Sequence, residues 1–146
     1  MKLILTSLFS VLFVGLTYSQ SCVSKYVGNY KIKIEPTIEN VKKMSKEKGQ
    51  ELPEEQVEMM TNMLSNFKLT LNDNEIILSA MGRENKQNFK ARTNADGSSC
   101  DLVPTIQNEA NKEAYLSIIE LDKKSIMMKA FGKSGDMDAF VWVKEK

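Results

Sequence analysis

The residues that could do chemistry in this chain are carboxylates, lysines and two cysteines, because the sequence contains no histidine. The lack of histidine removes Ser-His-Asp and Cys-His catalysis and the common zinc sites. Asp136 and Asp138 flank Met137 in a glycine-bearing turn, but the rest of a calcium-binding loop is absent, so we interpret them as turn residues. We therefore expect no catalytic residues, no metal and no cofactor. An enzyme that works with carboxylates and lysine alone is the alternative.

The N-terminus has the three regions of a secretory signal peptide. Lys2 supplies the positive charge, residues 3–16 form an uncharged apolar run, and Thr17 and Ser19 are small residues before a cleavage site. The apolar run is shorter than the roughly 20 residues that span a bilayer, so a transmembrane anchor is the weaker interpretation. We expect residues 1–19 to be removed and the protein to be secreted or periplasmic.

The two cysteines, Cys22 and Cys100, are predicted to form a disulfide in that oxidising compartment. A reactive thiol pair is the alternative, but the chain has neither Cys-x-x-Cys spacing nor a histidine that would lower a thiol pKa. Acylation of Cys22, as in a bacterial lipoprotein, is a second alternative. The sequence before Cys22 fits that processing poorly.

Composition argues against a charged macromolecular partner. Removal of residues 1–19 leaves 127 residues, the size of one domain, with 19 basic and 19 acidic side chains. A nucleic-acid-binding surface needs a basic face, and a membrane-surface segment needs a basic run; this chain has neither. We expect one domain over residues 20–146, with no nucleic-acid partner and no membrane anchor after cleavage.

Methionine is abundant, and Met59, Met60 and Met63 lie together. Because thioethers bind Cu(I), a copper carrier is one interpretation. Met44, Met60 and Met63, however, fall on the apolar stripes of predicted helices, where methionine fills irregular gaps. Core packing is therefore favoured, and only Met59 lies off the stripe.

The elements that would position these residues are mainly strands. Residues 27–35 alternate between apolar and charged side chains, as a half-buried strand does, and Pro36 is expected to end this strand. Two helices should follow, the first ending at Gly49 and the second starting at Pro53. Further strands are predicted at residues 67–71, 76–81, 88–93, 98–103, 114–121, 125–131 and 139–143, with turns that include 82–85, Asp96-Gly97 and Asp122-Lys123. This order predicts a mainly β fold, an antiparallel up-and-down barrel of about eight strands with two helices inserted between strands one and two; a sandwich of two sheets is the alternative.

The last three predicted strands are apolar on both faces. We assign to the inner face Tyr115, Ile119, Leu121, Ile126, Met128, Val141 and Val143, and to the outer face Leu116, Ile118, Met127, Phe131, Phe140 and Trp142. Strands that are apolar on both faces need cover on both faces. The cover could be the helix pair or, through the Phe131/Trp142 face, a second copy of the chain. The third interpretation is a register slip in the assignment.

The segment Gly28-Asn29-Tyr30-Lys31 resembles the Gly-x-Trp segment that opens the first strand of lipocalins and fatty-acid-binding proteins, with Tyr30 in place of tryptophan. Residues 69–74 resemble a strand and turn of bacterial lipocalin-like domains. The chain thus resembles a small secreted lipocalin-like (calycin) barrel, and its helix pair resembles the lid of fatty-acid-binding proteins. The closing strand, residues 141–144, lacks the Arg-x-Tyr pair that holds a carboxylate in the latter.

The resemblance implies that a small apolar or amphipathic ligand binds inside the barrel. Tyr30, Phe67 and Phe89 are the candidate wall residues, because aromatic side chains give a large contact area. Arg92 alternates outward and is not expected to clamp an anion. Barrels of eight strands can also be packed solid. The alternative is a structural or protein-interaction module with a solid core and no small-molecule ligand.

Overall fold

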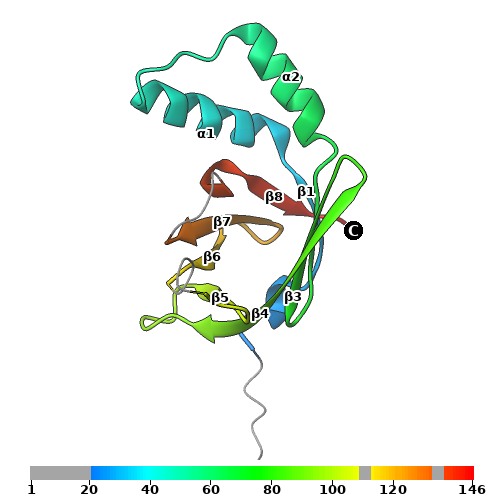
Figure 1. Ribbon diagram of the computed structural model, residues 1–146, viewed down its shortest axis with the longest axis vertical. Coiled ribbons are helices and arrows are strands. Elements are labelled where there is room, and N and C mark those ends of the chain that lie inside the picture. The colour runs from blue at the N-terminus through cyan, green and yellow to red at the C-terminus, as the bar shows by residue number, and fades with distance from the viewer. Residues whose placement is uncertain (1–20, 109–112, 133–136) are drawn as a thin grey trace, which may run out of the picture.

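The computed structural model describes residues 21–108, 113–132 and 137–146, so the predicted signal peptide and Asp136 lie outside the described residues. The described chain forms a closed barrel of eight antiparallel strands (Figure 1). Each strand pairs with the next along the chain, and β8 pairs with β1 to close the barrel. The predicted up-and-down barrel is therefore confirmed, with two helices between its first and second strands.

The elements are short and are joined mostly by tight turns. They are η1 (Ser24–Tyr26), β1 (Gly28–Ile32), α1 (Ile34–Glu47), α2 (Glu54–Leu64), β2 (Lys68–Leu71), β3 (Glu75–Ala80), β4 (Arg83–Thr93), β5 (Cys100–Pro104), β6 (Tyr115–Glu120), β7 (Ser125–Phe131), η2 (Met137–Ala139) and β8 (Val141–Lys144). Within the described ranges, no helix combines the length and the hydropathy that a membrane crossing requires.

Side chains from all eight strands fill the interior of the barrel. They belong to one cluster of buried apolar residues, and the strand residues in it include Tyr30, Ile32, Leu69, Leu71, Ile76, Phe89, Leu102, Ile118, Ile126, Met128 and Trp142. The strand registers place these residues on the same face of the closed sheet. An eight-stranded barrel is narrow enough for side chains to fill it. Here they do so except at the start of β4, where Asn85 and Gln87 lie on the same face of the sheet but are exposed.

The two ends of the barrel are covered by different elements. Figure 1 shows both helices over one end and the N-terminal η1 turn at the other. Leu64, the last residue of α2, is buried at the helix end, and Val23 and Tyr26 are buried at the η1 end. Buried apolar side chains therefore close both ends of the barrel, Leu64 at the helix end and Val23 and Tyr26 at the η1 end. We call the second group the N-terminal plug.

The first strand is shorter than predicted, because α1 already begins at Ile34. Pro36 does not end the strand; it lies in the first turn of α1, where its missing N–H costs no helical hydrogen bond. The helix ends are otherwise as expected. Gly49 follows α1 with a φ of 74°, a left-handed conformation that glycine adopts without strain, and Pro53 immediately precedes α2.

The fourth strand is longer than predicted. Residues 83–85 were expected to lie in a turn, but β4 begins at Arg83 and the turn before it is only Met81-Gly82. Both turn residues have positive φ, 51° and 76°, which is the two-residue type I′ hairpin geometry. Residues 83–88 are exposed, so neither face carries the apolar alternation from which a strand is predicted.

The predicted inner face of the last three strands was right for β7 but wrong for β6 and β8. Ile118 and Trp142 are fully buried in the interior, whereas Tyr115 stacks on Phe131 outside it at a centroid distance of 4.8 Å. The register-slip interpretation therefore holds for these two strands. Because Trp142 lies inside and Phe131 outside, the two residues do not share a face.

Candidate functional site

The candidate site is a cavity between the two helices and the end of the barrel, which we name the helix cavity. Its volume is about 280 Å³. It forms because apolar side chains of α1, of α2 and of the segment before β8 converge there. The lining residues are Val41, Met44 and Ser45 of α1, Lys48 and Gln50 of the loop after it, Met60, Met63 and Leu64 of α2, and Ala139 and Phe140 before β8.

Two hydrogen bonds fix α1 to the barrel beside this cavity. The buried Thr37 hydroxyl accepts a hydrogen bond of 3.0 Å from the main-chain N–H of Val141. The Asn40 side-chain amide donates a bond of 3.1 Å to the carbonyl of Ala139. Both main-chain partners belong to the segment that runs into β8, so one wall of the helix cavity is set by the barrel itself.

The walls of the helix cavity are apolar and its rim is polar. Met44, Met60 and Met63 contribute thioether side chains, which adapt to irregular shapes, and Phe140 contributes an aromatic ring. Ser45, Lys48 and Gln50 lie on the lining as well, and Lys48 and Gln50 are exposed. Such a cavity can take an apolar molecule whose polar or anionic end remains near Lys48.

The floor of the helix cavity is part of the barrel core. The ring of Phe140 makes edge-to-face contacts with Phe67 and with Trp142, each at a centroid distance of 6.2 Å. Trp142 is completely buried, and its Nε1 is the one buried side-chain nitrogen or oxygen among the described residues that has no hydrogen-bond partner. A molecule that displaces Phe140 would therefore change the packing around Trp142, the single tryptophan of the chain.

The methionines that lie together in the sequence separate in space. Met60 and Met63 line the helix cavity, whereas Met59 does not and is 68% exposed. Among the described residues, no group of three or more His, Cys, Asp or Glu side chains could hold a metal ion. Met60 packs against the core cluster as expected, whereas Met63 is 39% exposed.

The predicted ligand-binding residues lie at different depths. Phe89 is 3% exposed within the filled interior, Phe67 packs against Phe140 at the helix end, and Tyr30 lies towards the η1 end. Neither Phe67 nor Phe89 lines the helix cavity. Their predicted role in binding a ligand stays a prediction, and the structure brings only Phe67 close to the candidate site.

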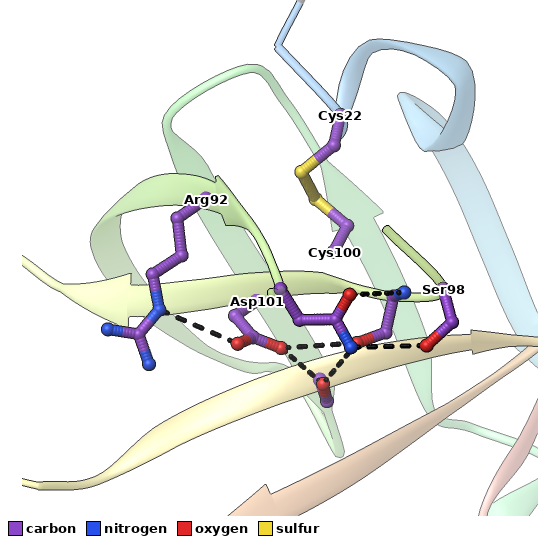
Figure 2. Close-up of polar contacts among 8 residues, drawn as sticks. Cys22, Arg92, Ser98, Cys100 and Asp101 are labelled. Atoms are coloured by element: carbon purple, nitrogen blue, oxygen red, sulfur yellow. Dashed lines mark hydrogen bonds and ion pairs between the residues drawn. A yellow bond between two sulfur atoms is a disulfide. The ribbon is translucent and has the colours of Figure 1, made fainter. Parts of the chain in front are cut away.

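The predicted disulfide is present between Cys22 and Cys100, and it lies beside a polar network that joins β4, β5 and β6 (Figure 2). The centre of this network is Asp101, which is only 5% exposed although it faces outward. Its carboxylate accepts hydrogen bonds from the Ser117 hydroxyl and, at 3.5 Å, from that of Ser99, and it pairs with Arg92 at 3.5 Å.

The Asp101 network joins the β4–β5 hairpin to β6. The Asn94 amide oxygen accepts a hydrogen bond from the main-chain N–H of Ser99, which holds the hairpin loop over Asp101. Both Ser117 and Ser99 donate to the Asp101 carboxylate, so this single acceptor orders a hydroxyl on the neighbouring strand and one in the hairpin loop. Arg92 faces outward, as expected, and half of its side chain is exposed.

Two turn residues also have defined partners. Asp138, which was interpreted as a turn residue, accepts a hydrogen bond of 2.8 Å from the main-chain N–H of Ala130. Asp122 accepts bonds of 2.8 Å from the main-chain N–H groups of Lys124 and Ser125, and these bonds lower its pKa. Asp122 therefore stabilises the turn before β7, and Asp138 fixes η2 to β7.

Sequence reasoning missed Phe140 and Asp101. Phe140 was assigned to the outer face of a strand, yet it precedes β8 and reaches the helix cavity. Asp101 follows a cysteine in a strand without any motif, and only the cross-strand pairing brings it next to Ser117 and Arg92. Neither residue has a local pattern that could have identified it.

Comparisons with known proteins give little beyond this geometry. No family model and no curated protein matches the chain. Among solved structures, the chain is similar to the Zn(II)-bound ZinT-like domain of Streptococcus pneumoniae AdcA, at 15% identity and a TM-score of 0.40, over 84% of this chain and 82% of that domain. Zn(II)-bound AdcA itself matches with the same identity and TM-score, but only over 32% of its length. These values are too low to support an inference about family or ligand.

Proposed function

We propose that this protein is an exported, non-enzymatic barrel protein that binds a small apolar or amphipathic molecule in the helix cavity. The observation that carries the proposal is the contrast between a barrel interior filled by side chains and an apolar cavity beneath the helices. The binding site thus lies under the helix pair instead of inside the barrel. The absence of histidine from the sequence supports a non-catalytic role.

The dimensions of the helix cavity suggest the size of the ligand. A dry protein cavity of about 150 Å³ is sufficient to bind benzene. The helix cavity, at about 280 Å³, is close to the lower end of the range for small-molecule sites. A molecule with one or two rings or a short acyl chain fits this volume, and Lys48 at the rim favours a polar or acidic end group.

Export is supported by two observations. The N-terminal residues have the pattern of a signal peptide. The Cys22–Cys100 disulfide, which uses both cysteines of the chain, is the kind of bond that persists in oxidising compartments.

The binding proposal is tested with the neutral fluorescent probe N-phenyl-1-naphthylamine, which does not depend on a cationic partner. We expect saturable enhancement of probe fluorescence with the wild-type protein. Met60→Lys should weaken binding about tenfold or more, since it places an ammonium group in the apolar wall. Met59→Lys is the matched control, because Met59 is adjacent in α2 but exposed outside the cavity. Met60→Gln, a milder change, covers the case in which Met60→Lys does not fold.

The result decides between the two functional hypotheses. A wild-type protein that shows no saturable binding would overturn the proposal and would favour the structural or protein-interaction module. The filled barrel interior is the observation that supports that second hypothesis. Equal losses in Met59→Lys and Met60→Lys would place the probe elsewhere and would also count against the helix cavity.

A further inference from the structure

A second cavity, which we name the η1 cavity, opens at the end of the barrel opposite the helices. Its volume is about 230 Å³. It lies between the η1 turn, the β6–β7 turn and the ends of β1 and β8. Tyr26, Tyr30 and Ile126 form its apolar surface, and the other lining side chains are charged.

The charge of the η1 cavity is predominantly positive. Four lysines line it, Lys25, Lys123, Lys124 and Lys144, against the two carboxylates of Glu120 and Asp122. Clefts lined by charges of one sign concentrate ions of the opposite sign. The lysines attract an external anion only where Glu120 and Asp122 do not already neutralise them.

The two carboxylates compensate at most two of the four lysines, and Glu120 is already paired with one of them, Lys25. Glu120 pairs with Lys25 at 2.9 Å and accepts a hydrogen bond of 3.3 Å from the Tyr26 hydroxyl, and the bond from Lys25 lowers the pKa of Glu120. Asp122 is bound by main-chain N–H groups of its own turn. Within the described part of the chain, Lys123, Lys124 and Lys144 form no ion pair with any carboxylate.

The position of Lys144 is set by the Gly28-x-Tyr30 segment of β1. A β-carbon on Gly28 would lie 2.5 Å from Lys144 Cε and 3.2 Å from its Nζ, so the lysine side chain occupies the space that the missing side chain leaves. The ammonium group lies 5.9 Å from the centre of the Tyr30 ring. The lysine is thus directed across the mouth of the barrel and towards the η1 cavity.

We propose that the η1 cavity binds a small oxyanion, a carboxylate or a phosphate group, through Lys144, Lys124 and Lys123. The side chains of Ile126 and Tyr30 allow the anion to carry a small apolar body. In this arrangement the Gly28-x-Tyr30 segment has a role in ligand binding, because it positions Lys144. The η1 cavity lies at the opposite end of the barrel from the helix cavity, so the proposal does not rest on the proposed function.

The proposal is tested by titrating the oxidised protein with sodium benzoate and, separately, with inorganic phosphate, at constant ionic strength. Amide NMR chemical shifts are the measurement. We expect saturable shifts that are localised to residues 123–125 and the start of β1, with a dissociation constant of about 1 mM or lower for at least one anion. Tighter binding of benzoate would identify an organic carboxylate as the ligand class, and tighter binding of phosphate a phosphate group.

Matched lysine variants show whether the η1 cavity is responsible. Lys144→Met and Lys124→Met should each weaken binding about tenfold, because each removes one charge-assisted contact. Lys68→Met removes the same charge from an exposed position on β2 outside the cavity and should leave binding unchanged. Shifts that do not saturate, that spread over all exposed lysines, or that weaken equally in Lys68→Met would overturn the proposal. Retained affinity in both cavity variants would overturn it as well.

Discussion

Cys22 and Cys100 are 78 residues apart in the chain, and their disulfide joins the segment before η1 to the first residue of β5. The residues next to this bond plug the barrel, since Val23 is completely buried and Tyr26 nearly so. Cys100 itself is buried in the core cluster. The disulfide therefore holds the N-terminal plug against the open end of the barrel.

Reduction of this disulfide should destabilise the fold strongly. The chain-entropy model gives about 4.5 kcal/mol for a closed loop of this length. We expect the free energy of unfolding, measured by urea denaturation, to fall by approximately that amount in a reducing buffer. The double variant Cys22→Ser, Cys100→Ser should behave in the same way and should no longer respond to the reductant. A loss below about 1 kcal/mol would show that the plug is held without the covalent bond.

The parts of the fold that could be predicted from the sequence are those with a local physical cause. Asp96-Gly97 and Gly49 have backbone conformations or turn contacts that few other residues provide, and both turns lie where they were expected. The alternation around Tyr30 and Leu69 reflects one buried and one exposed face, and both residues lie in the core. In these segments, local pattern and tertiary environment agree.

The parts that could not be predicted depend on tertiary contacts. In β6 and β8 both faces are apolar, because one face fills the barrel and the start of β8 is also covered by α1, so alternation does not decide which side Trp142 faces. The start of β4 has no buried face and so no pattern. For the sites, the methionine stripes were assigned to core packing and the ligand site to the barrel interior, and Phe140 and Lys144 reach their cavities only through strand pairing.

The close approach of Lys144 to Gly28 predicts that substitutions at these two positions have non-additive effects on the free energy of unfolding. Gly28 has a φ of 149°, so Gly28→Ala should cost about 1–2 kcal/mol from backbone strain alone, in addition to its collision with Lys144. In a double-mutant cycle with Lys144→Ala, the collision disappears, and we expect a coupling of about 0.5–1 kcal/mol in urea denaturation. Gly49→Ala is the control, because its β-carbon would meet nothing within 4 Å. The effects of Gly49→Ala and Lys144→Ala on the free energy of unfolding should be additive.

Removal of the Asp101 carboxylate should lower the free energy of unfolding more than removal of its partner Arg92. Asp101→Ala deprives the hydroxyls of Ser117 and Ser99 of a charged acceptor in a buried setting, so we expect a loss of about 2–3 kcal/mol in the free energy of unfolding. Arg92→Ala should cost less than about 1 kcal/mol, because the ion pair is open to solvent on the arginine side. Urea denaturation of both variants checks the order. The reverse order would mean that the ion pair, and not the hydroxyl network, stabilises this side of the barrel.

The burial of Tyr30 predicts a loss of stability at high pH. Desolvation, together with the proximity of Tyr26, raises the pKa of Tyr30 from 10.0 to about 12. The folded state thus favours the neutral phenol, which donates a hydrogen bond to the main-chain carbonyl of Tyr26. The resulting stabilisation is complete below pH 10 and is lost as the pH rises from 10 towards 12.

The measurement is the free energy of unfolding as a function of pH, combined with the ultraviolet absorbance of tyrosinate. Wild-type protein should lose stability more steeply between pH 10 and 12 than Tyr30→Phe, which has no hydroxyl to ionise at this position. Tyr115→Phe is the control, because it removes a hydroxyl from a tyrosine on the outer face of the barrel. If wild-type and Tyr30→Phe have parallel profiles, the Tyr30 hydroxyl is not desolvated in the folded protein, and the η1 end of the barrel must be more open to water than the packing around Tyr30 indicates.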